Sequence, residues 1–165
     1  MKEDEIYIAT KNWFKKKNFF SLAGQPPNGC DSIPSIEIKD FYNFDKGSKG
    51  SYKPDLVFAN KNYLILVECK PLDNINDEIK LNEIDSSENR KKLLYKEILN
   101  RRLFERKNLE ESFLDFDTIK KKLRYCLAHS GKPRRMEKVF SLVVSSLHGE
   151  GNIIQPTNLS YNVLF

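Results

Sequence analysis

Apolar positions recur at helical spacing near the start of the chain. Over residues 4–17 they fall on one stripe, and acidic residues at its beginning and lysines at its end suit the dipole of a helix. The stripe consists of Ile6, Ala9, Thr10, Trp13 and Phe14. This pattern predicts a first helix that buries the stripe. The glycine- and proline-rich residues 24–29 then interrupt regular structure.

Strand patterns occupy the next part of the chain. A short strand is predicted over residues 36–41, and the glycine-rich residues 47–51 predict a connecting loop. Residues 53–59 and 63–70 flank the turn-forming segment Asn60-Lys61-Asn62 and predict a β-hairpin. The second run is apolar on both faces, which is typical of a central strand.

Helical spacing returns after Pro71. Residues 75–107 are predicted to form two helical pieces, with Leu94, Ile98 and Leu99 among the inward positions. A further helix is predicted over residues 117–129. Its inner stripe would contain Ile119, Leu123, Cys126 and Leu127, with Lys120, Lys121 and Arg124 outside it.

A strand pattern closes the chain. Residues 138–147 predict a buried strand, and residues 161–165 are a candidate tail strand. The order α-β-β-β-α-α-β predicts an α/β sandwich in which helices flank a central mixed sheet. The 165 residues, 39% of them hydrophobic, suit one domain spanning residues 1–165.

Composition predicts the cellular location of the protein and the state of its cysteines. The longest apolar run is too short to cross a bilayer and the first residues lack the chemistry of a signal peptide, so we expect a cytoplasmic protein with no membrane association. Cys30, Cys69 and Cys126 have no CxxC spacing, which predicts free thiols rather than disulfides or a zinc ribbon.

The net charge of +5 is modest because 28 basic residues stand beside 23 acidic ones. Clusters of cations carry more information than the total, although such clusters are also common on solvated helix faces. Candidate contacts to a nucleic-acid backbone are Lys49, Lys120, Lys121, Arg124, Lys132, Arg134 and Arg135.

The hairpin brings acidic residues together. A loop of two or four residues around Asn60-Lys61-Asn62 places Asp55 opposite Glu68, with Cβ atoms about 4.5–5.5 Å apart, whereas a loop of odd length would break the alignment. Strand alternation puts Lys70 on the same face as Glu68. Two like charges at this distance repel each other, so the arrangement favours a divalent cation between the carboxylates.

These residues resemble the PD-(D/E)XK, or restriction-endonuclease-like, nuclease superfamily. Lys53-Pro54-Asp55-Leu56-Val57-Phe58 matches the first half of its motif, and Val67-Glu68-Cys69-Lys70-Pro71 matches the second. Glu-x-Lys also occurs at residues 37–39, 78–80 and 105–107, but only Glu68 ends a buried strand after a Pro-Asp pair. The resemblance covers the first half of the chain in detail, and it implies a restriction-endonuclease-like core.

The resemblance also implies roles for particular residues. Asp55 and Glu68 would hold one or two Mg²⁺ ions, with Mn²⁺ as a substitute, and the backbone carbonyl of Cys69 would be a further ligand. Lys70 would position the attacking water. An acidic residue of the first helix often completes such sites, which makes Glu5 a candidate and Glu3 the next choice.

The function that follows is Mg²⁺-dependent hydrolysis of DNA phosphodiester bonds by an endonuclease of restriction or defence type. A homodimer, or membership of a larger nuclease assembly, would allow both strands to be cut. Two alternatives remain open: a recombination or repair nuclease, such as a junction resolvase or a subunit of a larger complex, and a non-catalytic nucleic-acid-binding module on a nuclease fold.

Overall fold

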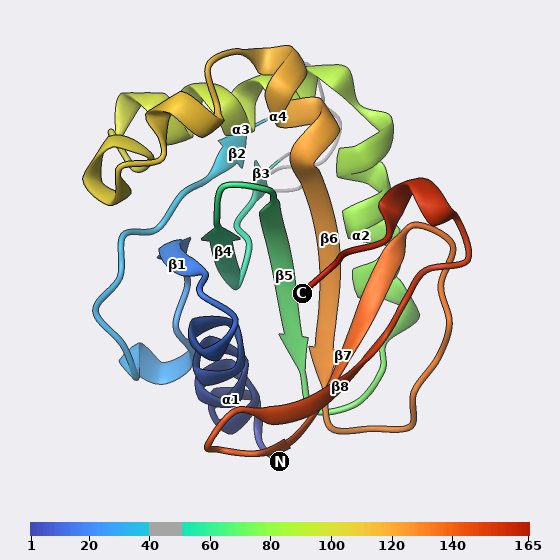
Figure 1. The fold of residues 1–165 in the computed structure, drawn as a ribbon. Coiled ribbons are helices and arrows are strands. Elements are labelled where there is room, and N and C mark those ends of the chain that lie inside the picture. The colour runs from blue at the N-terminus through green and yellow to red at the C-terminus, as the bar shows by residue number, and fades with distance from the viewer. Residues whose placement is uncertain (40–50) are drawn as a thin grey trace.

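A mixed six-stranded sheet forms the middle layer of the computed structural model, which describes residues 1–39 and 51–165 (Figure 1). In spatial order its strands are β1 (Phe20–Gly24), β4 (Leu56–Ala59), β5 (Leu64–Lys70), β6 (Leu123–His129), β7 (Val139–Ser146) and β8 (Glu150–Ile154). The three central strands β5, β6 and β7 are parallel, and the remaining pairs in the sheet are antiparallel. A separate ribbon pairs β2 (Ile38–Lys39) with β3 (Ser51–Tyr52).

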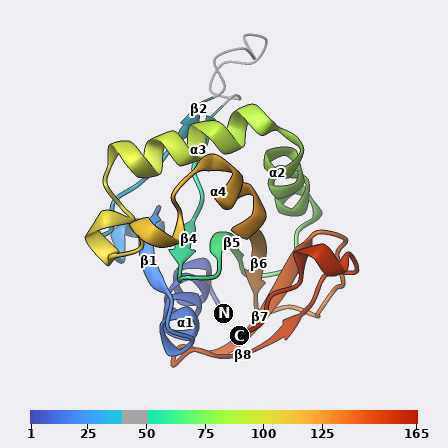
Figure 2. The same ribbon diagram turned by 45° about the horizontal axis from the view of Figure 1, so that its top comes forward.

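Helices cover both faces of the sheet (Figure 2). The helix α1 (Glu3–Lys16) packs on one face, and α2 (Ile75–Ser86), α3 (Glu88–Asn100) and α4 (Phe116–Lys122) pack on the other. Short 3₁₀ turns complete the chain: η1 (Pro27–Gly29), η3 (Glu105–Lys107), η4 (Glu110–Ser112) and η5 (Leu159–Tyr161). Among the described residues, the helices are all too short or too polar to cross a membrane.

The strand β5 shows how the two faces are separated. Leu64 and Leu66 pack with α2 and α3, whereas Ile65, Val67 and Cys69 pack with α1. Because successive side chains of a strand alternate, Glu68 and Lys70 belong to the face that α2 covers. This face therefore carries the charged end of the strand.

Several predictions from the sequence are confirmed. The first helix buries all five stripe positions, and the hairpin pairs Leu56 with Val67 and Ala59 with Leu64. Extended by one residue beyond β4, that register would place Asp55 opposite Glu68. The two helices α2 and α3, the buried strand β7 and the mixed α/β sandwich also agree with the predictions.

The predicted helix over residues 117–129 is wrong in its second half. The helix α4 ends at Lys122, and β6 begins at Leu123 and pairs in parallel with β5 and β7. Residues 125–129 are buried without interruption, which is typical of a strand covered on both faces. The helical spacing of Leu123, Cys126 and Leu127 was therefore overridden by tertiary packing.

Smaller differences lie at the edges. The tail strand is wrong: η5 occupies residues 159–161, no strand follows it, and the final Phe165 packs edge-on to Trp13 instead. The strands β1, β3, β6 and β8 were not predicted, so the expected order of elements is incomplete. Leu99 is 48% exposed rather than inward. The strand expected over residues 36–41 is the two-residue β2, and residues 40 and 41 lie outside the described part of the chain.

Candidate active site

Asp55, Glu68 and Lys70 meet at the end of β5, on the side of the sheet that faces α2. Both β5 and β6 run toward the end of the molecule where the N-terminus lies (Figure 1). The Lys70 ammonium lies 3.8 Å from Asp55 Oδ2. The hairpin thus gathers the three residues that the sequence singled out.

The backbone of Asp55 is fixed by the end of β1. The amide of Gln25 donates a hydrogen bond of 2.9 Å to the Asp55 carbonyl. A Cβ atom on Gly24 would lie 2.7 Å from that same carbonyl oxygen, so only glycine allows the two segments to approach this closely. A residue with a side chain at position 24 would displace Asp55.

The side chain of Asp55 is held by β5. Its Oδ2 atom accepts a hydrogen bond of 2.8 Å from the backbone amide of Cys69. Because the N–H and C=O groups of one strand residue face the same neighbouring strand, the Cys69 carbonyl is also directed to the Asp55 side. The Cys69 thiol is fully buried on the opposite face, with α1.

Glu68 is a buried carboxylate that is only partly satisfied. The residue is 3% exposed, and its Oε1 atom has no hydrogen-bond partner among the described residues. Burial raises the pKa of Glu68 to about 8, and the nearby Asp55 carboxylate contributes to the rise. Burial also raises the pKa of Asp55, against the hydrogen bond from Cys69 and the charge of Lys70. Both groups therefore resist ionisation, and a bound cation would favour their charged forms.

Lys70 keeps its proton at neutral pH. Burial acts to lower its pKa, but the hydrogen bond to Glu3 and the charge of Asp55 raise the pKa above the ordinary lysine value. The group is therefore an ammonium that donates hydrogen bonds and does not accept them.

The acidic residue of α1 that reaches the trio is Glu3. Its Oε1 atom lies 2.6 Å from the Lys70 ammonium. Glu5, which the sequence analysis preferred, instead accepts a hydrogen bond of 2.8 Å from the backbone amide of Lys2 and so caps its own helix. Both acids lie in the first helical turn, where the dipole favours them, and the sequence pattern alone does not separate their roles.

Two residues of α2, Asp77 and Lys80, complete the surroundings of the trio, and neither was predicted from the sequence as part of the site. Asp77 is 1% exposed, and its charge acts on Asp55, Glu68 and Lys70. Its Oδ1 atom accepts a hydrogen bond of 2.8 Å from Lys80, while its Oδ2 atom is buried with no partner among the described residues. In the sequence Asp77 looks like an ordinary acidic residue of a first helical turn, so no signal distinguished it.

Two cavities meet at Asp55. The first has a volume of about 590 Å³ and lies between the beginning of α1 and η1, where Lys2, Glu3, Asp4 and Asn28 line it. The second has a volume of about 320 Å³ and holds the trio together with Lys53, Lys80 and Arg90. The trio is therefore accessible from the α2 side.

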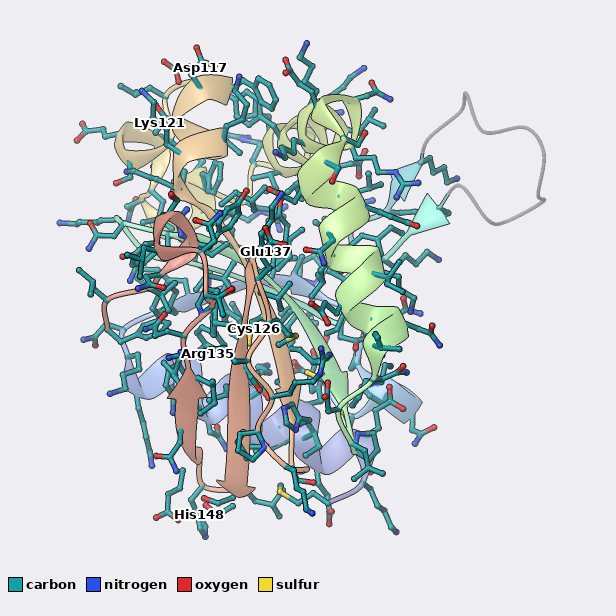
Figure 3. All side chains as sticks on the ribbon, turned by 90° about the vertical axis from the view of Figure 1, so that its right-hand side faces the viewer. Asp117, Lys121, Cys126, Arg135, Glu137 and His148 are labelled. Carbon is teal, nitrogen blue, oxygen red and sulfur yellow. The ribbon has the colours of Figure 1, made fainter. Side chains whose placement is uncertain are left out.

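The basic residues near α4 lie at the other end of the sheet. The helix ends where Leu123 pairs with Leu64, the first residue of β5, whereas Lys70 is the last of its seven residues, roughly 20 Å away. Figure 3 shows Lys121 at the opposite end of the molecule from His148, which follows β7. Lys120 pairs with Asp117 at 2.9 Å.

Arg124 differs most from its expected position. It lies on β6 and not on the outer face of a helix, and it is half-buried over the ring of Tyr63. Its guanidinium donates hydrogen bonds of 2.8 Å to the carbonyls of Lys121 and Leu123. These contacts give Arg124 a structural role at the start of β6.

The remaining basic candidates differ in whether they are exposed or held in salt bridges. Lys132 and Arg135 are exposed in the segment after β6, whereas Arg134 forms salt bridges with Asp73 and Glu78 and ties that segment to α2. Lys49 lies outside the described residues.

The oxygen atoms that could bind a divalent cation come from a small number of groups at this site. In the described part of the chain, no three His, Cys, Asp or Glu side chains are arranged as a metal site. What the structure offers is the unpartnered Glu68 Oε1, the Asp55 carboxylate and the direction of the Cys69 carbonyl. Oxygen donors of these kinds suit Mg²⁺.

Comparison with models of protein families, with curated proteins and with solved structures finds no match to this chain.

Proposed function

We propose that this chain is a Mg²⁺-dependent DNA endonuclease of the PD-(D/E)XK class, of restriction or defence type. The observation that carries the proposal is Glu68, a buried and partly unsatisfied carboxylate that shares a cavity with Asp55 and Lys70, while Lys70 pairs with Asp55. Perturbed groups of this kind are concentrated at functional sites. The order of a first helix, the antiparallel strands β1, β4 and β5, the helices α2, α3 and α4, and the parallel strand β6 also supports the proposal.

Asp55, Glu68 and the Cys69 carbonyl would hold the cation. The chemistry that Mg²⁺ supplies when bound is polarisation of a phosphate and a lowered pKa for a coordinated water. The Lys70 ammonium would orient the attacking water and stabilise negative charge on the phosphate as the reaction proceeds. Glu3, in contact with Lys70, would hold that ammonium in position. Since one copy carries one such trio, cutting both strands implies a homodimer or a larger assembly.

The first prediction tests this trio by cleavage of supercoiled plasmid across a Mg²⁺ series. We expect wild type to cut, and Asp55→Asn and Lys70→Ala to lose at least about a hundredfold in rate, as removal of one charge-stabilising group does in other enzymes. Asp55→Asn should also weaken Mg²⁺ binding in calorimetry, whereas Lys70→Ala should retain it.

Matched controls are Asp117→Asn and Lys61→Ala, which remove the same charges from exposed positions at the far end of the sheet. Both should cut at the wild-type rate. Equal cleavage by wild type and either trio variant at all Mg²⁺ concentrations would refute the proposed site. Metal-free DNA binding by a wild type that never cuts would favour a non-catalytic binding module.

A further inference from the structure

The cavity beside Glu68 has an acidic floor and a basic wall. Glu68 is buried in it and Asp55 is half-buried, and Lys53, Lys80 and Arg90 line it with Lys70. Glu83 also lines the cavity and forms an ion pair of 3.5 Å with Arg90. Among the described residues that line the cavity, the four cations outnumber the three acids, so the cavity is net positive even without metal, and a divalent cation over the floor carboxylates would add to this charge. Such a surface would attract an anion that lies over the metal.

Lys80 is anchored so that its ammonium remains available. Its partner Asp77 has a side chain that is only 2% exposed, whereas the Lys80 side chain is 51% exposed. An ammonium has three donors, so one hydrogen bond to Asp77 leaves two for a further acceptor. The buried Asp77 thus fixes the direction of Lys80 at the cavity wall.

Lys53 stands on the strand side of the same cavity. It is exposed, precedes the Pro54-Asp55 pair, and forms no salt bridge with the described residues. Lys53 and Lys80 therefore flank the carboxylates from two separate elements, the segment before β4 and the helix α2.

The other cavity at Asp55 has the opposite character. Among the described residues that line it, Lys2 is the only cation, beside Glu3, Asp4 and Asp55. A polyanion is thus repelled on the α1 side of Asp55 and attracted on the α2 side. The lysines of α4 lie about one strand length from either cavity.

We infer that the phosphodiester backbone of the substrate approaches the site across Lys53 and Lys80, on the α2 side of β5. This inference rests on the proposed nuclease function and names the surface that the substrate uses. Each lysine would contact one phosphate next to the one that is cut, and would contribute affinity without reading base sequence.

The experiment measures binding of a fluorescein-labelled DNA duplex by anisotropy, in EDTA, over a series of salt concentrations. The test variant is Lys53→Gln/Lys80→Gln, in which the new amide at position 80 can still donate a hydrogen bond to Asp77 and so protects the fold. The control is Lys120→Gln/Lys121→Gln. It is closely matched, because Lys120 also pairs with an aspartate three residues earlier and Lys121 is also exposed.

We expect the test variant to reduce the slope of log K against log salt by about two, and to bind about tenfold or more weakly at roughly 0.1 M salt. The control should change the slope by less than half as much. If wild type binds or cuts DNA and the two double variants lose affinity equally, or the control loses more, the inference is overturned and the proposed function stands. If wild type neither binds nor cuts DNA, both fall together.

Discussion

Two buried carboxylates of this chain have opposite surroundings. Asp85, on α2, accepts hydrogen bonds from Tyr161 at 2.8 Å and Lys138 at 3.0 Å, and Lys91 lies 3.4 Å from its other oxygen. Glu68, on β5, keeps one oxygen without a partner among the described residues. The two residues are 8% and 3% exposed, so burial alone does not distinguish them.

Their pKa values move in opposite directions. Burial opposes the charge of Asp85, but the hydrogen bonds from Tyr161 and Lys138 and the nearby lysine charges outweigh it and lower the pKa. For Glu68, burial and the charge of Asp55 together raise the pKa to about 8. A buried acid with full compensation binds elements together, whereas one without it is a cost that folding alone does not explain. This contrast separates structural acids from candidate functional ones.

The largest effect on stability is expected from Asp85→Asn. The change leaves Lys138 and Lys91 without their common partner, and it should lower the free energy of unfolding by about 2–4 kcal/mol. Because the folded pKa of Asp85 is lowered, its contribution is present above the unfolded pKa and is lost as pH falls through the folded pKa. Urea unfolding of both proteins at neutral pH measures the difference. A loss below about 0.5 kcal/mol would remove the contrast with Glu68.

The opposite sign is expected from Glu68→Gln in the absence of divalent cations. The amide removes a group that resists ionisation, so the free energy of unfolding at neutral pH should rise by about 1–3 kcal/mol. In wild type the folded state binds the Glu68 proton more tightly than the unfolded state does. Stability should therefore fall as pH rises from about 4.5 to about 8.

The measurement is urea unfolding of wild type and Glu68→Gln across that pH range in EDTA, and the variant should show a flatter pH dependence. Mg²⁺ provides the internal control, because a ligand that binds the folded state stabilises it. Mg²⁺ should raise the stability of wild type and leave the variant almost unchanged. A variant that is less stable than wild type at every pH would show that the Glu68 charge is compensated after all.

The sequence was sufficient for the part of the site that local pairing determines. The register of the hairpin follows from its short loop, and strand alternation then sets the faces of Glu68 and Lys70. The first helix could also be predicted from the sequence, because the residues of its apolar stripe recur with the period of a helix. These features depend on contacts between neighbours in the chain.

The remainder of the site depends on contacts between distant elements. Glu3 on α1 reaches Lys70 at the end of β5, and Asp77 on α2 is buried close enough for its charge to act on the trio. Arg124 was predicted to lie on a helix, but its segment is the strand β6, which pairs with parallel strands on both sides. The spacing of residues along the sequence does not show how distant elements pack. A basic residue within a cluster, such as Arg124, can therefore have a structural role instead of binding a nucleic acid.

The smallest effect is expected from Asp117→Asn, which extends the comparison to an exposed acid. Asp117 pairs with Lys120 at 2.9 Å, yet its side chain is 74% exposed. Water screens such a pair, so the loss of the pair and of a favourable charge in the first turn of α4 should together lower the free energy of unfolding only slightly. Urea unfolding in low and high salt measures this loss, which should diminish as salt is added. A loss comparable to that of Asp85→Asn would mean that proximity to a lysine, and not the degree of burial, decides how much a carboxylate contributes to this fold.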